Sequence, residues 1–342
     1  MRKGANISKD VLLNPSVSSH RVIIPLYIPN EEDYYKEAYQ IFEYCLFSVI
    51  KTSATQLKIS VISNNSCDSV NDKLYELQKK GFIDELIIEK EAIGKINSIL
   101  KALRTAEERL ITITDADVLF CNGWEEAVSE VFEAFPKAGA VSPVPVFRKQ
   151  LHLTSNIWWR YLFSKKLSFS PVKNPEAMER FAQSLGWFSL EDRFKDVICT
   201  LEGKNNALAV LGCSHFVATY KREVFEQLPR NNSKYKLGGD SEFLYTDEPV
   251  LKMGGYRLAT YDNYAYHMGN HVEPWMQNVY ETIAEINSKK EIAFSFKKLK
   301  KSSWSYFFTE HIFKKIFYFK ACYDFLLRKK GLTKEQLKKF WY

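Results

Sequence analysis

The sequence contains no long uncharged apolar run in any of its 342 residues. A membrane-spanning helix needs about 20 consecutive apolar residues, so we expect no such helix. The first twenty residues also lack the apolar core of a secretory signal peptide, and residues 1–19 are expected to be a loose polar leader. Internal repeats and low-complexity tracts are absent as well, which argues against a repeat protein.

Cysteine is scarce and shows no pairing pattern. The six cysteines form neither a Cys-x-x-Cys pair nor any other metal-ligand spacing, which argues against a structural zinc site. We expect reduced thiols, most of them small core residues of a cytoplasmic protein. They are Cys45, Cys67, Cys121, Cys199, Cys213 and Cys322.

The net charge of +7 is concentrated at the carboxyl end. Residues 271–342 hold 15 Lys and Arg against 7 Asp and Glu, and they carry 17 of the 50 aromatic residues. A basic and aromatic segment of this kind suits an anionic membrane surface. It equally suits a helical subdomain that packs its aromatic residues onto the main body. Binding to nucleic acid is not expected, because no nucleic-acid motif accompanies the charge.

Strands and helices alternate through the first 120 residues. Runs of β-branched residues predict strands, and each is followed by a segment with apolar residues at helical spacing. Repeated strand–helix units imply a parallel sheet whose ligands bind beyond the carboxyl ends of its strands. The predicted strands are 21–28, 57–63, 86–89 and 110–114, and the predicted helices are 31–50, 70–80 and 96–108.

The pattern is looser after residue 120. An amphipathic helix is predicted over 307–328, and Thr333 and Gln336 have the spacing of a capping box at the start of another helix. The other predicted helices are 124–135, 221–228 and 248–253, and the other predicted strands are 140–147, 207–219, 257–261 and 264–267.

The most informative motif is Asp115-Ala116-Asp117, directly after the apolar strand 110–114. Two carboxylates held together where a strand leaves the core are costly unless a cation or a ligand compensates them. A divalent cation with oxygen ligands, which would also hold the phosphates of a nucleotide, meets this need. The alternative is a simple turn, because Asp favours turns through its own hydrogen bonds.

Several blocks together resemble the glycosyltransferases of family 2, which have the GT-A fold. Asn64 departs from this family, which usually has an aspartate there. The blocks occur in the family's order: residues 22–27 with Asn30 and Glu31, residues 61–68, residues 94–97, residues 115–117, residues 211–214 with 221–225, and His267. The resemblance covers about residues 20–270.

The resemblance implies a Rossmann-like, mostly parallel central sheet flanked by helices, with a C-terminal helical extension. It implies a metal site for Mn²⁺ or Mg²⁺ formed by Asp117, Asp115 and His267, with His271 as a competitor for the last position. Asp115 could instead contact the ribose or a metal-bound water. The residues that the resemblance assigns to the nucleotide donor are Pro25, Tyr27, Asn30, Glu31, Asn64, Lys95 and Asp115.

The catalytic base of this family is a carboxylate that precedes a Gly-Tyr pair. Asp247 is preferred because it opens an acidic helix start with Pro249 in the first turn. Asp240 is a close second, and Glu242 and Glu248 remain open. A capping role competes with catalysis at Asp247, since Asp is favoured at helix starts.

The resemblance therefore predicts a metal-dependent inverting glycosyltransferase that moves a sugar from a nucleotide-diphosphate donor, expected to be a UDP-sugar. The acceptor would be a surface glycan or a lipid-linked glycan, and the basic tail would hold the enzyme at the inner membrane face. The expected division is a leader (1–19), a nucleotide-sugar-binding half (20–120), an acceptor-binding half (121–270) and the extension (271–342). The alternatives are a sugar nucleotidyltransferase, although the Gly-rich loop of such enzymes is missing, and an inactive glycan- or protein-binding module.

Overall fold

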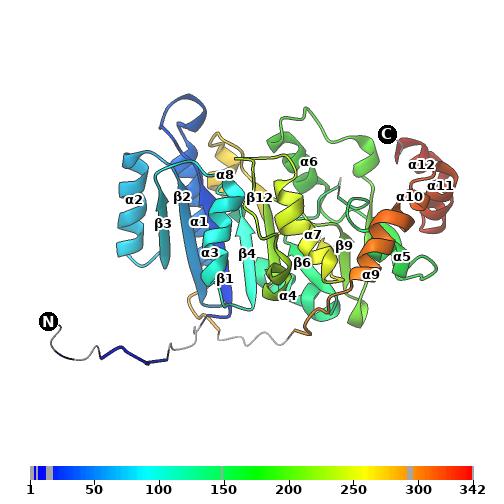
Figure 1. The fold of residues 1–342 in the computed structure, drawn as a ribbon. Helices are drawn as coiled ribbons and strands as arrows, with labels where there is room; N and C mark the ends of the chain where they lie inside the picture. The colour runs from blue at the N-terminus through cyan, green and yellow to red at the C-terminus, as the bar shows by residue number, and fades with distance from the viewer. Residues whose placement is uncertain (1–3, 5–6, 13–17, 148, 291–295, 341–342) are drawn as a thin grey trace.

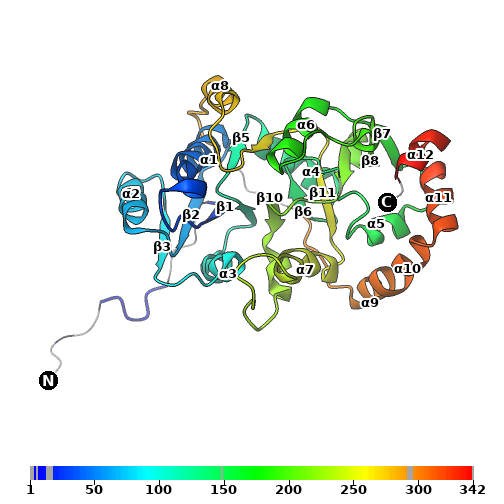
Figure 2. The same cartoon turned by 90° about the horizontal axis from the view of Figure 1, so that it is seen from above.

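A computed structural model describes residue 4 and residues 7–12, 18–147, 149–290 and 296–340 (Figure 1). Parts of the predicted leader, residues 1–3, 5–6 and 13–17, lie outside the described residues. Within the described ranges a ten-stranded sheet has the order β3-β2-β1-β4-β10-β6-β11-β9-β8-β7. Helices cover both of its faces, so the predicted α/β class with a C-terminal helical extension is confirmed (Figures 1 and 2).

The first half of the sheet is parallel, as the alternating pattern predicts. Strand β1 pairs with β2 on one side and β4 on the other, and β2 pairs with β3. Helices α1 and α2 cover one face and α3 covers the other (Figure 2). The elements are β1 (His20–Leu26), α1 (Ala38–Thr52), β2 (Leu57–Asn64), α2 (Asp68–Lys79), β3 (Glu85–Glu89), α3 (Lys95–Thr105) and β4 (Leu110–Thr114).

The second half is mixed, but seven of the ten strands in the described sheet run in one direction. Only β10, β9 and β7 run the opposite way, because β10 pairs antiparallel with β4 and β6 while β6 and β11 are parallel. The strands are β6 (Ala138–Ser142), β7 (Leu167–Pro171), β8 (Val197–Glu202), β9 (Leu208–Leu211), β10 (Val217–Lys221) and β11 (Tyr256–Thr260). The helices are α4 (Trp124–Ala134), α5 (Ser155–Arg160), α6 (Pro175–Ser184), α7 (Glu248–Lys252) and α8 (Pro274–Thr282).

The single strand predicted over 207–219 is wrong. Gly212 ends β9 with a φ of +97°, and a Cβ there would lie 2.4 Å from the carbonyl oxygen of Lys149. The chain therefore leaves the sheet at Gly212, where β9 lies between β11 and β8, and re-enters it at Val217 as β10 between β4 and β6. The largely apolar run 207–219 suits one long strand or two short ones, and Gly212, Ser214 and His215 are the sequence signs of the break.

A small second sheet lies beside the large one. Strand β5 (Val118–Phe120) follows the Asp115–Asp117 motif directly and pairs antiparallel with β12 (Ala265–His267). In this register His267 lies opposite Val118. Two residues separated by 149 positions in the sequence are therefore fixed side by side.

The C-terminal extension is a series of short helices. It consists of α9 (Ser303–Phe307), a π-helical turn (Phe308–Phe313), α10 (Lys314–Phe317), α11 (Lys320–Lys329) and α12 (Lys334–Phe340). The single predicted helix 307–328 is interrupted between α10 and α11. The predicted capping box is confirmed, since the Gln336 amide donates to Thr333 Oγ1 and the Thr333 amide donates to Gln336 Oε1. Among the described residues no helix is both long and apolar enough to cross a bilayer.

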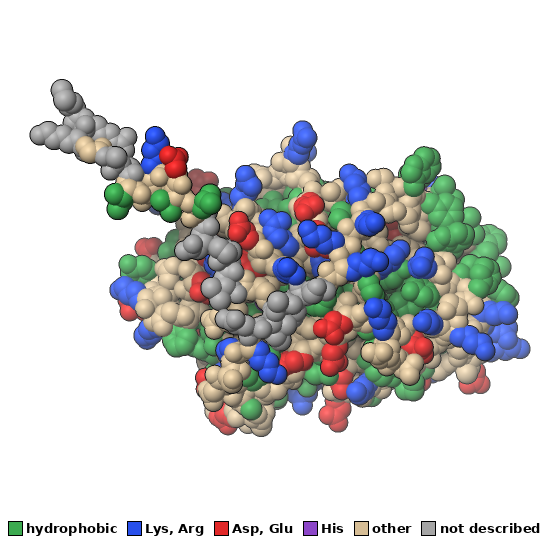
Figure 3. All heavy atoms as spheres, turned by 90° about the horizontal axis from the view of Figure 1, so that it is seen from below, with side chains coloured by type: hydrophobic (Ala, Val, Ile, Leu, Met, Phe, Trp, Pro, Cys, Tyr) green, Lys and Arg blue, Asp and Glu red, His purple; other side chains and the backbone are tan. Residues whose placement is uncertain are grey.

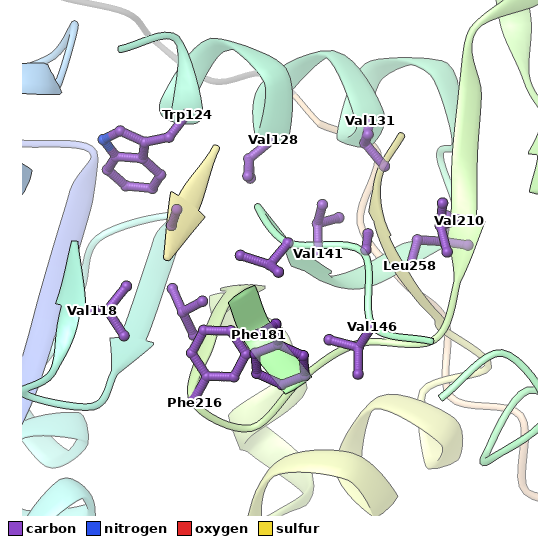
Figure 4. Close-up of a cluster of buried hydrophobic side chains, with 14 of the residues drawn as sticks. Val118, Trp124, Val128, Val131, Val141, Val146, Phe181, Val210, Phe216 and Leu258 are labelled. Atoms are coloured by element: carbon purple, nitrogen blue, oxygen red, sulfur yellow. The ribbon is translucent and has the colours of Figure 1, made fainter. Parts of the chain in front are cut away.

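The hydrophobic core lies between the sheet and the helix layers. In Figure 4, Trp124, Val128 and Val131 of α4 face Val141, Val210 and Leu258 of the sheet, while Phe181 and Phe216 lie against each other. The two rings are stacked with centroids 5.1 Å apart. Burial of such side chains supplies most of the stability of a domain of this size.

One buried carboxylate of α4 contacts the segment between α1 and β2 and the start of β1. Glu125 accepts hydrogen bonds from the backbone amides of Ala54 and Thr55, at 2.8 and 2.9 Å, and interacts with His20 Nδ1 at 2.6 Å. Burial acts to raise the pKa of Glu125, but the partners outweigh it and the pKa is lowered. The carboxylate therefore stays ionised and fastens the segment after α1.

We expect Glu125→Ala to lower the free energy of unfolding by about 3–5 kcal/mol, because it leaves two buried amides without acceptors. Urea unfolding at pH 7 measures this change. Glu126→Ala, at the exposed neighbouring position, is the matched control and should change stability by less than about 0.5 kcal/mol. Equal effects of the two substitutions would show that the Glu125 contacts contribute nothing specific.

Candidate active site

A cleft of about 400 Å³ opens beyond the carboxyl ends of β1, β2 and β4. This is where the strand–helix pattern predicts a ligand. Six of the predicted site residues line it: Pro25, Tyr27, Asn64, Lys95, Asp115 and Asp117. The side chains of Tyr34, Tyr35, Lys236, Leu237 and Asn270 also line it and were not predicted.

Asp115 does not stand alone in this cleft. Its Oδ1 lies 2.5 Å from Lys95 Nζ, and the same ammonium lies 3.3 Å from Glu242 Oε1. Burial acts to lower the pKa of Lys95, but these two carboxylates outweigh it and raise the pKa. Lys95 is therefore a permanent cation held between two anions at the floor of the cleft.

The chain of charges continues behind Glu242. His215 Nδ1 lies 3.0 Å from Glu242 Oε2, and its Nε2 lies 2.6 Å from Asp247 Oδ2. Asp247 in turn pairs with Arg257 at 2.6 Å, where both side chains are almost fully buried. Six groups thus alternate in sign with no net charge when His215 is protonated: Asp115, Lys95, Glu242, His215, Asp247 and Arg257.

We call these six alternating groups the charge chain, and the pKa values of Glu242, His215 and Asp247 within it shift in the directions that ion pairing favours. The hydrogen bond from His215, helped by Lys95, lowers the pKa of Glu242 to about 2. Burial opposes the charged form of His215, but its hydrogen bonds to Asp247 and Glu242 outweigh burial. Burial also opposes the charged form of Asp247, but Arg257 and His215 outweigh it. The pKa of His215 is therefore raised and that of Asp247 is lowered.

Asp117 has a different environment. Its Oδ1 is buried without a hydrogen-bond partner, and its Oδ2 lies 3.4 Å from His267 Nε2. The β5–β12 pairing brings the two together, and Ser184 Oγ, 3.1 Å from His267 Nδ1, orients the ring. Burial is the main cause that raises the pKa of Asp117. An orphaned carboxylate oxygen beside an imidazole nitrogen is a fitting donor pair for a divalent cation.

The described residues contain no group of three or more His, Cys, Asp or Glu side chains placed to hold a metal ion. Asp115, expected to share an ion with Asp117, is paired with Lys95 instead. Two protein donors, Asp117 and His267, are what the fold provides. A cation bound there would need further oxygen ligands from a substrate or from water.

The segment Gly94–Asn97 fastens a loop along the wall of the cleft. Gly94 has a φ of +96°, and a Cβ on it would lie 2.7 Å from Lys236 Cα. The Lys95 amide donates to the carbonyl oxygen of Lys236, and Asn97 exchanges two hydrogen bonds with the backbone of Ser233. The loop that carries Lys236 is therefore positioned by the start of α3, and Lys236 and Lys95 line the same cleft.

An aromatic group lies at the other side of the cleft. Tyr35 makes edge-to-face contacts with Tyr27 and Tyr34, with centroids 5.9 and 5.0 Å away. Tyr27 and Tyr34 are exposed, so their faces are open to a planar ligand.

The other residues predicted to contact the nucleotide donor either make hydrogen bonds within the protein or lie outside the cleft lining. Asn64 lines the cleft, but its Oδ1 accepts from the Ile93 and Gly94 amides and holds that turn. Asn30 accepts from the Glu32 amide, and Glu31 pairs with Lys73 outside the cleft lining.

The other two carboxylates considered as bases differ in exposure. Asp240 is exposed, and its backbone carbonyl accepts the Leu244 amide. Glu248 pairs with Lys252 and with the Tyr306 hydroxyl, both at 2.8 Å, so it faces the C-terminal extension.

Sequence reasoning missed His215, Tyr34, Tyr35 and Lys236. His215 follows the Leu211–Ser214 block that carried the family resemblance, and a histidine beside a strand start was the available signal. The other three occur in loops, where nothing in the pattern separates a ligand contact from a solvated side chain.

The family comparison agrees with this geometry. A family model described as "Glycosyl transferase family 2" matches residues 22–228, which is more than half of the chain. No curated protein matches the sequence.

Solved structures of similar shape were also found. The mannosyltransferase PcManGT from Pyrobaculum calidifontis, in complex with GDP-Man and Mn²⁺, is 19% identical over 74% of this chain and 57% of that chain, with a TM-score of 0.40. TarS 1–349 from S. aureus is 13% identical over 73% and 60%, with a TM-score of 0.42. GalNAc-T7 with UDP, GalNAc and Mn²⁺ is 12% identical over 82% and 47%, with a TM-score of 0.45. The chain thus spans about half to three fifths of the length of these proteins.

The charge chain predicts a pH-dependent stability. Because the pKa of His215 is raised by folding, its contribution is fully present below its ordinary value of 6.5 and is lost as pH rises through the raised value. We expect His215→Gln to lower the free energy of unfolding by about 2 kcal/mol at pH 6, and by less at pH 9.

Urea unfolding of both proteins at pH 6 and pH 9 measures this difference. His271→Gln, at an exposed histidine 3.4 Å from Glu37, is the control and should change the free energy of unfolding by less than about 0.5 kcal/mol at both pH values. A His215→Gln effect of constant size across this range would mean that folding does not raise the pKa of His215.

Proposed function

Because the chain belongs to glycosyl transferase family 2, we propose that it is a metal-dependent inverting glycosyltransferase that uses a nucleoside-diphosphate sugar. The single observation that carries this proposal is the pairing of the orphaned Asp117 carboxylate with His267 at the rim of a cleft that also contains Lys95. A buried carboxylate beside an imidazole and a nearby ammonium suit a cation and a diphosphate together.

We assign the metal to Asp117 and His267, with Mn²⁺ or Mg²⁺ as the expected ion. Bound there, the ion would neutralise the negative charge that develops on the diphosphate as the glycosidic bond breaks. Asp115 takes a second role in this proposal. Its contact with Lys95 keeps that ammonium at the floor of the cleft, where it meets the phosphates.

The nucleoside would occupy the side of the cleft lined by tyrosines. Tyr27 and Tyr34 offer exposed ring faces for stacking, and Asn64 shapes the turn beneath. A UDP-sugar is the donor that we expect, and a panel of nucleotides tests this choice.

The reaction is a single displacement at the anomeric carbon. The acceptor oxygen forms the new bond, the bond to the phosphate oxygen breaks, and a carboxylate takes the hydroxyl proton. We assign that carboxylate to Glu242, which is partly exposed and lies beside Lys95. When Lys95 turns towards the phosphates, one of the charges that lower the pKa of Glu242 is withdrawn, and its basicity rises.

Asp247 was preferred from the sequence, and its place in the structure suits a supporting role. It is buried and ion-paired with Arg257, and it reaches Glu242 only through His215. We propose that Asp247 positions His215 and that Asp240, which is exposed, is the alternative base.

The acceptor is proposed to be a glycan or a lipid-linked glycan in cell-surface polysaccharide synthesis, approached from the side of residues 121–270. Residues 20–120 would bind the donor, and residues 271–342 would hold the enzyme at the inner membrane face.

Asp117→Asn should abolish metal-dependent donor turnover, with at least a hundredfold loss of kcat/KM, because the cation loses its charged ligand. The melting temperature should stay within a few degrees, since the lost oxygen has no hydrogen bond to forfeit. Release of UDP from UDP-sugars, with Mn²⁺ or with a chelator, measures the activity.

Asp72→Asn on α2, outside the cleft lining, is the matched control and should leave turnover unchanged. Full activity of Asp117→Asn, or activity of the unsubstituted protein in chelator, would refute the metal assignment. Release of pyrophosphate in place of a nucleoside diphosphate would identify a nucleotidyltransferase.

Glu242→Gln should lower kcat by about a hundredfold or more while the Kd for UDP with Mn²⁺ changes only a few-fold, because a general base acts on the chemical step. Single-turnover kinetics with bound donor separate the two quantities. Asp240→Asn is the comparison, and we expect it to keep near-normal kcat. The reverse pattern would make Asp240 the base.

A further inference from the structure

The outer side of the C-terminal helices presents large apolar side chains to solvent. We name Trp304, Phe307, Ile312, Ile316 and Phe319 the C-terminal apolar face. Trp304 is 86% exposed and Phe319 is 66% exposed. Single exposed apolar residues are ordinary, but five within 16 residues on one short helical segment are not.

The opposite side of the same segment is firmly packed. Phe313 and Phe317 are buried, and Phe317 lies against the buried Trp158 with centroids 5.0 Å apart. Trp159 contacts Phe313 at 5.3 Å. Because one side anchors the segment to the body, the C-terminal apolar face is held outward and contributes little to the core.

Positive charge surrounds this face. Residues 296–342 contain 13 Lys and Arg against 3 Asp and Glu, a net charge of +10. Lys300, Lys301 and Lys315 are exposed within or next to the face. Figure 3 shows hydrophobic side chains gathered at the right-hand end of the molecule, where the C-terminal helices lie, with Lys and Arg side chains beside them.

We propose that the C-terminal apolar face docks on an anionic phospholipid surface. Aromatic and aliphatic side chains on one side of a helix enter the boundary between headgroups and acyl chains, while flanking lysines meet the lipid phosphates. A second copy of this chain is a poorer occupant, because two faces of the same strong positive charge repel each other.

The face lies on the side of the molecule where the acceptor is proposed to bind. Helix α9 is joined to α7 through Tyr306, which donates to Glu248, and the Ser302 amide, which donates to the Lys252 carbonyl. Helix α7 follows directly after Asp247 of the charge chain. Resting on the proposed function, this placement means that a lipid-linked acceptor could extend from the bilayer towards Glu242.

Co-sedimentation with vesicles tests the proposal on the full chain. The protein should sediment with phosphatidylcholine vesicles that contain phosphatidylglycerol, and much less with phosphatidylcholine alone. Raising NaCl from about 0.1 M to about 0.5 M should weaken binding, since it screens the lysines. Failure to sediment with the anionic vesicles would overturn the proposal.

Two variants test the face itself. Trp304→Ser/Phe307→Ser/Phe319→Ser removes apolar contact, and Lys300→Glu/Lys301→Glu/Lys315→Glu reverses charge. Each should lower the partition coefficient by at least about tenfold. Unchanged binding of the charge-reversed variant, which leaves the packed side intact, would also overturn the proposal.

The matched controls carry the same chemistry elsewhere on the surface. Tyr75→Ser/Phe188→Ser removes exposed aromatic residues, and Lys80→Glu/Lys90→Glu/Lys204→Glu reverses exposed charges, so both should bind vesicles normally. A dimer seen by light scattering and lost in the aromatic variant would instead assign the face to self-association.

The vesicle-binding experiment can fail or succeed independently of the tests of the proposed glycosyltransferase activity. Vesicle binding needs neither donor nor metal, and Asp117→Asn should sediment as the unsubstituted protein does. Lost binding in that variant would contradict the separate location of the face.

Discussion

The structure depends on how it balances charge where the two halves of the sheet meet. Asp115 follows β4, Glu242 and Asp247 lie in one helical segment, and Lys95, His215 and Arg257 separate the three carboxylates in an alternating chain. Three buried or half-buried carboxylates so close together would otherwise repel each other and disfavour the fold. Asp117 is left outside this balance, with His267 at 3.4 Å from its Oδ2 and no hydrogen-bond partner for its Oδ1, and this is the reason that we propose a cation there.

Local pattern was sufficient to predict the parallel first half of the sheet. The strands around residues 20–114 are apolar runs separated by helices, and parallel strand–helix units can form only a few arrangements. The positions of Asp115, Asn64 and Lys95 at one edge follow from that topology alone. Beyond residue 120 the outcome depends on where the chain leaves one position in the sheet and enters another. The break after β9 lies at Gly212, but a glycine in a largely apolar run fits a bulge within one strand as well as a gap between two strands.

The partners within the site were beyond the reach of sequence. The Asp-x-Asp spacing predicted two carboxylates at one rim, but not that Asp115 would meet a lysine while Asp117 met a histidine. Each contact joins residues that are far apart in the sequence. Lys95 and Glu242 are 147 positions apart, and the β5–β12 pairing brings His267 to Asp117. A propensity or a motif depends on residues that are close in sequence. It can therefore identify a candidate carboxylate, but it cannot identify the distant residue that neutralises it.

The composition of the C-terminal extension was also insufficient to predict which of its residues are buried. Basic and aromatic content suggested either packing on the body or contact with a membrane, as if these excluded each other. One helical segment has both a packed side and an exposed side, because Phe313 and Phe317 are buried while Trp304 and Phe319 are exposed. Composition averages over the faces of a helix and cannot separate them. Which aromatic residues are buried depends on the side of the helices that faces the main domain. The aromatic residues on the other side stay exposed to solvent.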